Sequence, residues 1–171
     1  MNLSTFFSSQ NALLFYFTIL PTALISSCTK PYEKSVNIDG HYRWGDTTNA
    51  FGEIYLYSLN DSTALFYFQS YNGYNLGELF GEINIKDTIG YSFTQDEFQK
   101  CNLKFIFTRN EVEIITMNDC ENCGFGYGVC ADGLYELKPG GAPKYFIDIG
   151  SRKISFEGLT LEKYKNLYND L

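Results

Sequence analysis

Short runs of alternating aromatic and aliphatic residues, separated by turn-forming residues, are the feature that most restricts how this chain can fold. Phe51–Leu59 and Thr63–Tyr71 flank Asn60-Asp61, an arrangement typical of a β-hairpin. Side chains alternate between the two faces of a strand, so each run can turn one face toward a core. The same arrangement recurs in two further pairs of runs, Gly81–Ile85 with Ile89–Phe93 and Cys101–Thr108 with Val112–Met117.

Four more runs have the composition of strands, which brings the expected number to about ten at a spacing of roughly ten residues. Aromatic residues form 18% of the chain, and closing a barrel would remove the exposed edges of such adhesive strands. The sequence therefore predicts an all-β fold, a small antiparallel barrel or sandwich of about 8–10 strands. The four additional runs are Asn37–Trp44, Gly133–Lys138, Lys144–Ile149 and Lys153–Glu157.

The C-terminal segment changes from the strand pattern to a helical one. Thr160 can cap a helix, and Glu162 then lies in the first turn, where its charge suits the helix dipole. We expect a short C-terminal helix packed on the barrel. Its apolar stripe would consist of Leu161, Tyr164, Leu167, Tyr168 and Leu171.

The N-terminal segment differs from the rest because residues 1–27 contain no charged side chain. Its apolar run, Ala12–Ile25, would form a helix of roughly 21 Å, shorter than the ~30 Å hydrocarbon core of a bilayer. Such a run is typical of the hydrophobic region of a signal peptide. It ends in Ile25-Ser26-Ser27-Cys28, which resembles the lipobox of bacterial lipoproteins. An ordinary buried segment with a chance cysteine is the alternative.

The lipobox resemblance implies that residues 1–27 are removed and that Cys28 receives acyl chains such as palmitate. We expect residues 28–36 to form a lipidated tether and residues 37–171 to form a single β domain. Two or three acyl chains anchor a protein stably, whereas one does not. The lipid bilayer is therefore an expected partner, and the expected location is the bacterial outer membrane, facing the periplasm.

Four further cysteines, Cys101, Cys120, Cys123 and Cys130, are expected to form two disulfides, because exported compartments are oxidising. A hairpin turn centred on Asn110-Glu111 would place Cys101 opposite Cys120 and leave Cys123 to pair with Cys130. The alternatives are a tetrahedral zinc site formed by the four thiolates and cysteines that stay free or only partly paired. The glycine-rich stretch GFGYG lacks the Lys-Ser/Thr of a phosphate-binding loop and favours a tight, disulfide-closed loop with positive φ. We expect neither a cofactor nor a metal.

The chain offers little for nucleic-acid binding or for catalysis. Its net charge is −7 and no basic cluster occurs, which argues against nucleic acid as a partner. The only histidine, His41, lies within an expected strand. Glu78 and Glu82 would share one face of a strand. This placement fits a pair of carboxylates for hydrolysis and equally fits a solvated surface. We expect a protein that is not an enzyme; a carboxylate-dependent envelope hydrolase is the least favoured alternative.

The segment from Tyr71 to Asn75 is the strongest candidate for partner binding and is predicted to be a loop. It combines two aromatic rings, of Tyr71 and Tyr74, with two amides, of Asn72 and Asn75. Aromatic faces beside amide groups suit sugars or a partner protein. The alternative is a turn closed by Asn-Gly whose tyrosines cover a hydrophobic rim.

The segment CGFGYGVCADGLYELK, with PKYFIDIGSRKISF after it, is similar to uncharacterised small lipoproteins of Bacteroidota. This resemblance implies no activity. In architecture alone, the expected domain also resembles the small lipid-anchored barrels of periplasmic lysozyme inhibitors. We therefore expect a non-catalytic envelope lipoprotein that binds a protein or a glycan. The alternative is a lipocalin-like carrier of a small apolar ligand.

Overall fold

The computed structural model describes residues 36–46, 49–95 and 100–169. The expected signal peptide, the lipidation site Cys28 and most of the expected tether lie outside the described residues. Within the described ranges, no helix has the length and apolar character needed to cross a membrane.

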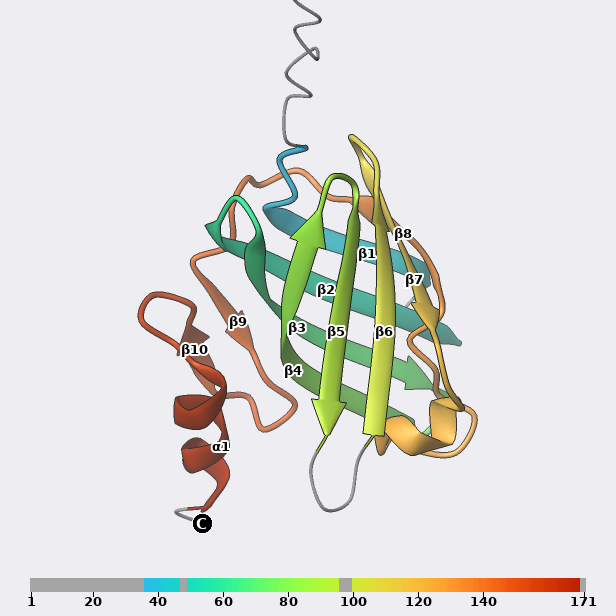
Figure 1. Ribbon diagram of the computed structural model, residues 1–171. Helices are drawn as coiled ribbons and strands as arrows, with labels where there is room; N and C mark the ends of the chain where they lie inside the picture. The colour runs from blue at the N-terminus through green and yellow to red at the C-terminus, as the bar shows by residue number, and fades with distance from the viewer. Residues whose placement is uncertain (1–35, 47–48, 96–99, 170–171) are drawn as a thin grey trace, which may run out of the picture. The chain divides into compact units, whose positions relative to one another are not determined.

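Eight strands form a closed antiparallel barrel in which strands adjacent in the chain are also adjacent in the sheet (Figure 1). The last of these strands returns to the first, with Leu137 opposite Tyr42. The all-β prediction is confirmed, and the barrel is the form that the chain adopts. The strands are β1 (Gly40–Asp46), β2 (Ala50–Asn60), β3 (Thr63–Asn72), β4 (Asn75–Lys86), β5 (Ile89–Gln95), β6 (Lys100–Phe107), β7 (Glu111–Thr116) and β8 (Gly133–Leu137).

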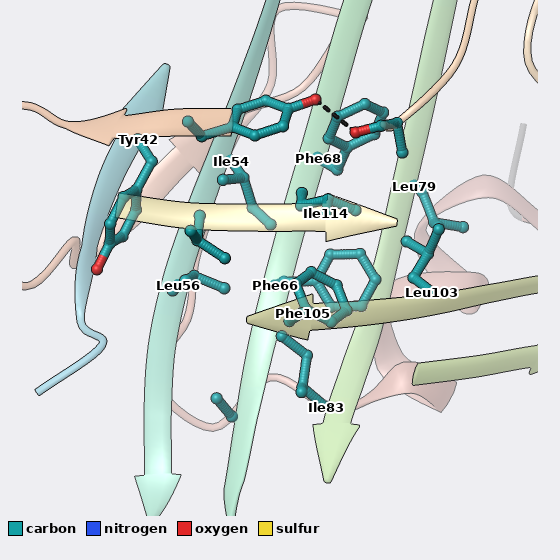
Figure 2. Packing of buried hydrophobic residues seen from close by; sticks show 14 of the residues in the cluster. Tyr42, Ile54, Leu56, Phe66, Phe68, Leu79, Ile83, Leu103, Phe105 and Ile114 are labelled. Carbon is teal, nitrogen blue, oxygen red and sulfur yellow. Dashed lines mark hydrogen bonds between the residues drawn. The ribbon is translucent and has the colours of Figure 1, made fainter. Parts of the chain in front are cut away.

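Alternate residues of these strands fill the interior of the barrel with a packed core (Figure 2). The ring of Phe66 lies tilted against Phe105, with 5.3 Å between the ring centroids. Phe68 meets the ring of Tyr135 edge-on at 6.3 Å. Such aromatic pairs add to the free energy that burial of their surfaces provides. Other members of this cluster are Tyr42, Ile54, Leu56, Leu79, Ile83, Leu103 and Ile114.

Three C-terminal elements lie on the outside of the barrel (Figure 1). β9 (Tyr145–Ile147) and β10 (Lys153–Ser155) form a two-stranded sheet, and α1 (Leu161–Asn169) follows. The hydroxyl of Thr160 accepts a hydrogen bond from the backbone N–H of Lys163 at 3.2 Å, which confirms the predicted cap. The predicted C-terminal helix is therefore confirmed.

A second apolar cluster joins these elements to the barrel. The ring of Phe146 stacks on Tyr67 with 4.0 Å between centroids and lies 5.0 Å from Phe156. On α1, Tyr164 stacks on Phe80 at 4.4 Å, which confirms that the helix packs on the barrel. Both faces of β3 are consequently buried, one by the interior and the other by this cluster.

β4 pairs with β3 along most of its length but with β5 only near its end. The β3–β4 ladder extends from Asn75 to Asn84, whereas the β4–β5 ladder consists of the three pairs between Asn84 and Lys86 on β4 and their partners on β5. β4 turns away from β5 beyond this point (Figure 1). Within the described part of the chain, the last residues of β5 therefore have a ladder partner, β6, on one side only.

Candidate functional site

The two ends of the barrel carry different connections. The segment that leads into β1 lies at the end formed by the β2–β3, β4–β5 and β6–β7 turns (Figure 1). The β3–β4 turn and the long β7–β8 connection, which contains the short 3-10 helix η1 (Cys120–Cys123), lie at the opposite end. The predicted binding segment, Tyr71–Asn75, and the cysteine-rich connection therefore lie at the same end of the barrel. The described chain begins at the other end.

The β3–β4 turn projects one tyrosine into solvent. The two strands remain paired up to Asn72 opposite Asn75, so only Gly73 and Tyr74 form the turn. Gly73 has a φ of 63°, which favours glycine, and Tyr74 is fully exposed (103%). The prediction of a loop from Tyr71 to Asn75 is therefore wrong, because cross-strand pairing continues almost to its centre.

The four residues expected to bind a partner have different roles in this arrangement. The ring of Tyr71 is half-buried and tilted against Phe51, with 5.5 Å between centroids. Asn72 donates a hydrogen bond from Nδ2 to the carbonyl of Gly128 at 2.9 Å and so holds the neighbouring loop. Asn75 is half-buried at the start of β4. Among the four, Tyr74 is the residue whose whole side chain is available to a partner.

Two disulfides shape the β7–β8 connection. Cys101 on β6 is bonded to Cys123, and Cys120 is bonded to Cys130, with Cα–Cα distances of 4.3 and 5.3 Å. The expectation that all four cysteines pair is confirmed, but the expected connectivity, Cys101–Cys120 with Cys123–Cys130, is wrong. Cys101 and Cys123 are fully buried, whereas Cys120 and Cys130 are half-exposed.

The register of the β6–β7 hairpin explains this difference. Phe107 faces Val112, so the turn is centred on Arg109-Asn110, one residue earlier than the predicted centre at Asn110-Glu111. Moving the centre by one residue moves the position opposite Cys101 by two, to Asn118. The chain then leaves the sheet, and η1 carries the second cysteine of the CxxC motif back to β6.

The loop closed by the Cys120–Cys130 disulfide docks on the β3–β4 hairpin. The backbone N–H of Gly126 donates to the carbonyl of Leu76 at 2.9 Å, beside the Asn72–Gly128 hydrogen bond. The loop thus adds a backbone hydrogen bond to β4 near the start of that strand. The two connections form one continuous surface as a result.

Phe125 of the same loop closes this end of the barrel core. Its ring lies 5.4 Å from that of Phe68, and a Cβ atom at Gly77 would lie 2.8 Å from it. Gly124 and Gly128 have φ values of 72° and 71°, which confirms the prediction of a tight, disulfide-closed loop with positive φ. The glycines therefore allow both the turns and the close approach to β4.

Tyr127, between two glycines of this loop, is 88% exposed. A hollow of about 570 Å³ lies beside it, with Asp119 and Glu121 among its lining residues. We refer to Asn72, Tyr74, Leu76 and Tyr127 as the tyrosine surface. Tyr127 was not among the predicted site residues, because a tight turn was a sufficient explanation for GFGYG. The signal in the sequence was an aromatic residue between glycines in a loop closed by a disulfide.

One group of potential metal ligands occurs in the described part of the chain. The ligand atoms of Cys120, Cys130 and Asp132 lie within 4.8 Å of one another. Metal coordination requires thiolates, whereas these two sulfur atoms are bonded to each other. The arrangement therefore favours a disulfide-closed loop over the alternative of a four-cysteine zinc site. The expectation of no bound metal stays a prediction.

His41 belongs to a polar cluster on the outer wall, centred on Glu53. The carboxylate lies 3.6 Å from His41 Nε2 and 3.3 Å from Arg43 Nε, and it accepts a hydrogen bond from Gln69 Nε2 at 3.0 Å. Burial alone would raise the pKa of Glu53, but His41, Gln69 and Arg43 outweigh it and hold the pKa below its usual value. His41 thus has Glu53 as a charged neighbour. Its ring also stacks on that of Tyr55, with 4.3 Å between the ring centroids.

The two carboxylates considered for hydrolysis have separate surroundings. Glu78 accepts a hydrogen bond from the hydroxyl of Tyr164 of α1 at 3.2 Å, and the hydroxyl oxygen of Tyr168 lies 3.4 Å from the same carboxylate oxygen. Glu82 instead lines a hollow near the first turn of the same helix. Glu78 thus helps to attach α1 to the barrel, an explanation that does not involve catalysis.

Asp148 is a buried carboxylate that ties the C-terminal elements together. It accepts hydrogen bonds from the backbone N–H and the Nε of Arg152, both at 2.7 Å, and from the hydroxyl of Tyr168 at 3.0 Å. Burial alone would raise the pKa of Asp148, but these hydrogen bonds and the charge of Arg152 outweigh it and lower the pKa. The ionised form is therefore the one that stabilises the fold.

Replacing Asp148 by asparagine is expected to lower the free energy of unfolding by about 1 kcal/mol at pH 7. A lowered folded-state pKa means that the unfolded chain binds more protons, so this contribution is complete above the usual Asp pKa of about 4 and is lost as the pH falls below it. Urea unfolding from pH 7 to pH 2.5 measures the effect. The difference between the wild type and Asp148→Asn should shrink below pH 4, whereas the exposed control Glu157→Gln should show none.

Comparison of the chain with protein-family models, curated proteins and solved structures finds no match.

Proposed function

We propose that this chain is a lipid-anchored, non-catalytic protein of the bacterial outer membrane that binds a protein or a glycan through the tyrosine surface. One observation carries the proposal: Tyr74 and Tyr127 expose their rings on two connections that are joined to each other. Tyrosine combines a large apolar face with a polar tip, which suits protein interfaces and sugar rings alike.

The rigidity of the tyrosine surface supports a role in binding. The Gly126–Leu76 and Asn72–Gly128 hydrogen bonds join the two connections, and the Cys120–Cys130 disulfide closes the loop that carries Tyr127. A surface ordered before it meets its partner loses less conformational entropy on association. The positions of the two rings are therefore suited to recognition.

The position of the tyrosine surface also agrees with anchoring at Cys28. The segment that leads into β1 lies at the opposite end of the barrel (Figure 1). The expected tether precedes this segment in the sequence. An acylated Cys28 would hold that end toward the membrane. The tyrosine surface would then be available to partners in the periplasm.

The packing of the barrel favours surface binding over the carrier alternative. Phe66, Phe68 and Phe105 occupy the interior together with the other buried side chains (Figure 2). A carrier of an apolar molecule needs an interior cavity large enough for its ligand. Side chains of the barrel itself take up this space.

Replacing both Tyr74 and Tyr127 by alanine is expected to weaken partner binding at least about tenfold, because exposed aromatic anchors contribute more than about 1 kcal/mol each. The two partner classes are tested separately, with soluble peptidoglycan fragments as the glycan and lysozyme as the protein. Titration calorimetry of the full chain in detergent gives both affinities. The free energy of unfolding should change by less than about 0.5 kcal/mol per substitution.

Tyr145→Ala is the matched control, because Tyr145 is a partly exposed tyrosine on β9, outside the tyrosine surface. It should leave the affinity unchanged. Equal losses from Tyr145→Ala and from the double substitution would contradict the proposed site. If neither probe binds, the wild type and the double variant are each used to capture material from a cell-envelope extract. Recovery of equal amounts by the two proteins would contradict the proposed function.

A further inference from the structure

The incomplete ladder between β4 and β5 leaves backbone groups without a partner strand among the described residues. Lys86–Ile89 and Asn84–Tyr91 are the last hydrogen-bonding positions of the hairpin, since such pairs alternate along antiparallel strands. The next pairs in this register would be Glu82–Phe93 and Phe80–Gln95. Neither pair forms, although all four residues lie within strands.

The N–H and C=O groups of Phe93 and Gln95 therefore point away from β6, into the space beside β4. An unpaired strand edge of this kind is a template for another strand. The equivalent position nearer the β3–β4 turn is already occupied, because Leu76 accepts a hydrogen bond from Gly126. The unpaired stretch is thus confined to the last residues of β5 and the middle of β4.

A hollow of about 490 Å³ lies next to this edge. Ser92 and Phe93 of β5 form one side, and Leu161 and Glu162 of the first turn of α1 contribute to the other. Phe93 is 64% exposed, so an apolar side chain is available at its rim. We refer to this hollow, together with the unpaired edge of β5, as the β5 groove.

We propose that the β5 groove binds an extended peptide of a partner protein, which adds to β5 as a further strand. Strand addition beside an exposed sheet edge is an established mode of peptide recognition. The unpaired edge of Ser92–Gln95 is about 13 Å long at 3.3 Å per residue, which corresponds to a peptide of four or five residues. This proposal concerns a surface separate from the tyrosine surface and does not depend on it.

The charges of the groove indicate the kind of peptide. Glu82 and Glu162 contribute two carboxylates to its lining, against one ammonium group from Lys165. A peptide with a basic side chain between apolar residues would complement this charge and contact Phe93. An apolar small molecule, in contrast, would leave the N–H and C=O groups of the β5 edge without partners.

Hydrogen exchange of the free protein provides the first test. In the nitrogen-15-labelled full chain in detergent, the amide of Phe93 should exchange at least about 100-fold faster than that of Tyr91, which is paired with Asn84. Comparable protection of both amides at all protein concentrations would show that the edge is already occupied within the chain and would overturn the proposal. Protection that appears only as protein concentration rises would assign the edge to a second copy of this chain and would overturn it equally.

The second test uses the acetylated and amidated peptide Val-Lys-Val-Thr-Val as the probe. We expect saturable shifts of the Phe93 and Gln95 amide signals and slower exchange of both. The same peptide methylated at alternate backbone nitrogens should bind at least about tenfold more weakly, because it lacks the donors that strand addition requires. Equal binding of the two peptides, or no shift at millimolar peptide, would overturn the proposal.

Two variants with the same change in charge test the position of the peptide. Glu162→Lys, in the groove, is expected to weaken binding about threefold, as loss of a surface ion pair would do. Glu157→Lys is the control, because Glu157 is an exposed residue outside the groove. Neither substitution removes a backbone group of the barrel. Equal effects of the two variants would place the peptide elsewhere and would overturn the proposal.

Discussion

Replacing Phe146 by alanine should lower the free energy of unfolding by about 3–5 kcal/mol, the usual cost of removing a fully buried phenylalanine. Phe146 is 1% exposed and lies at the centre of the second apolar cluster. Its ring contacts Tyr67 on the barrel at 4.0 Å and Phe156 at 5.0 Å. Because neighbouring rings are held by separate elements, they cannot close the resulting cavity completely. Urea unfolding followed by tyrosine fluorescence measures the change.

Ile147 is the matched control for this substitution. It is the next residue on β9 and faces solvent with 53% of its surface exposed. Ile147→Ala should cost less than about 1 kcal/mol. Similar losses from the two variants would contradict the conclusion that β9 packs on the barrel through the face that carries Phe146.

Removing the Cys101–Cys123 disulfide by substituting alanine at both positions is the second large effect. A closed loop of 22 residues contributes about 3 kcal/mol through the entropy of the unfolded chain. Both cysteines are fully buried, so replacing them by the smaller alanine lowers the free energy of unfolding further. The same change at Cys120 and Cys130 opens a loop of 10 residues and should cost about 2.5 kcal/mol. Urea unfolding of the two double variants measures both losses.

Peptide mapping without reductant tests the connectivity on which this prediction rests. Cleavage after lysine, arginine and glutamate separates Cys101 from Cys120, and both from the fragment that contains Cys123 and Cys130. The observed pairing joins all three fragments into one species. A fragment that holds Cys123 and Cys130 but is joined to neither of the others would contradict it.

The alternation of apolar residues was sufficient to predict most strands and the all-β class. It works well for β2, β3 and β6, where one face or both faces are buried. It failed at the start of β4, because Gly77 and Gly81 interrupt the pattern where Phe125 and Phe66 pack against the backbone. Glycine at these positions allows a side chain to pack closely against the strand backbone. Hydrophobic alternation does not predict such a contact.

The disulfide connectivity and the cover on the barrel could not be predicted in the same way. A shift of one residue in the β6–β7 turn changes which residue faces Cys101, and several turns fit the sequence equally well. The stretch ALFYF in β3 is apolar on both faces, which indicates that something covers the outer wall. It does not indicate that β9, β10 and α1 do so, because that depends on contacts distant in the sequence.

The candidate site was predicted in part for a similar reason. The sequence drew attention to Tyr74 together with Tyr71, Asn72 and Asn75, yet these three residues continue the strands. Tyr127 lies in the loop predicted from the cysteines and glycines, but its exposure depends on how Gly126 and Gly128 dock on β4. Local pattern indicates which residues are in turns; which of them share a surface follows from the closure of the barrel.

The proposed location in the envelope and the proposed choice of partner both depend on the proposed processing at Cys28. The intact mass of the protein from a membrane fraction, measured without reductant, tests this claim most directly. We predict a chain that begins at Cys28, carries added acyl mass and is about four daltons lighter than its fully reduced form because of the two disulfides. A chain that retains residues 1–27 with four free thiols would contradict the account.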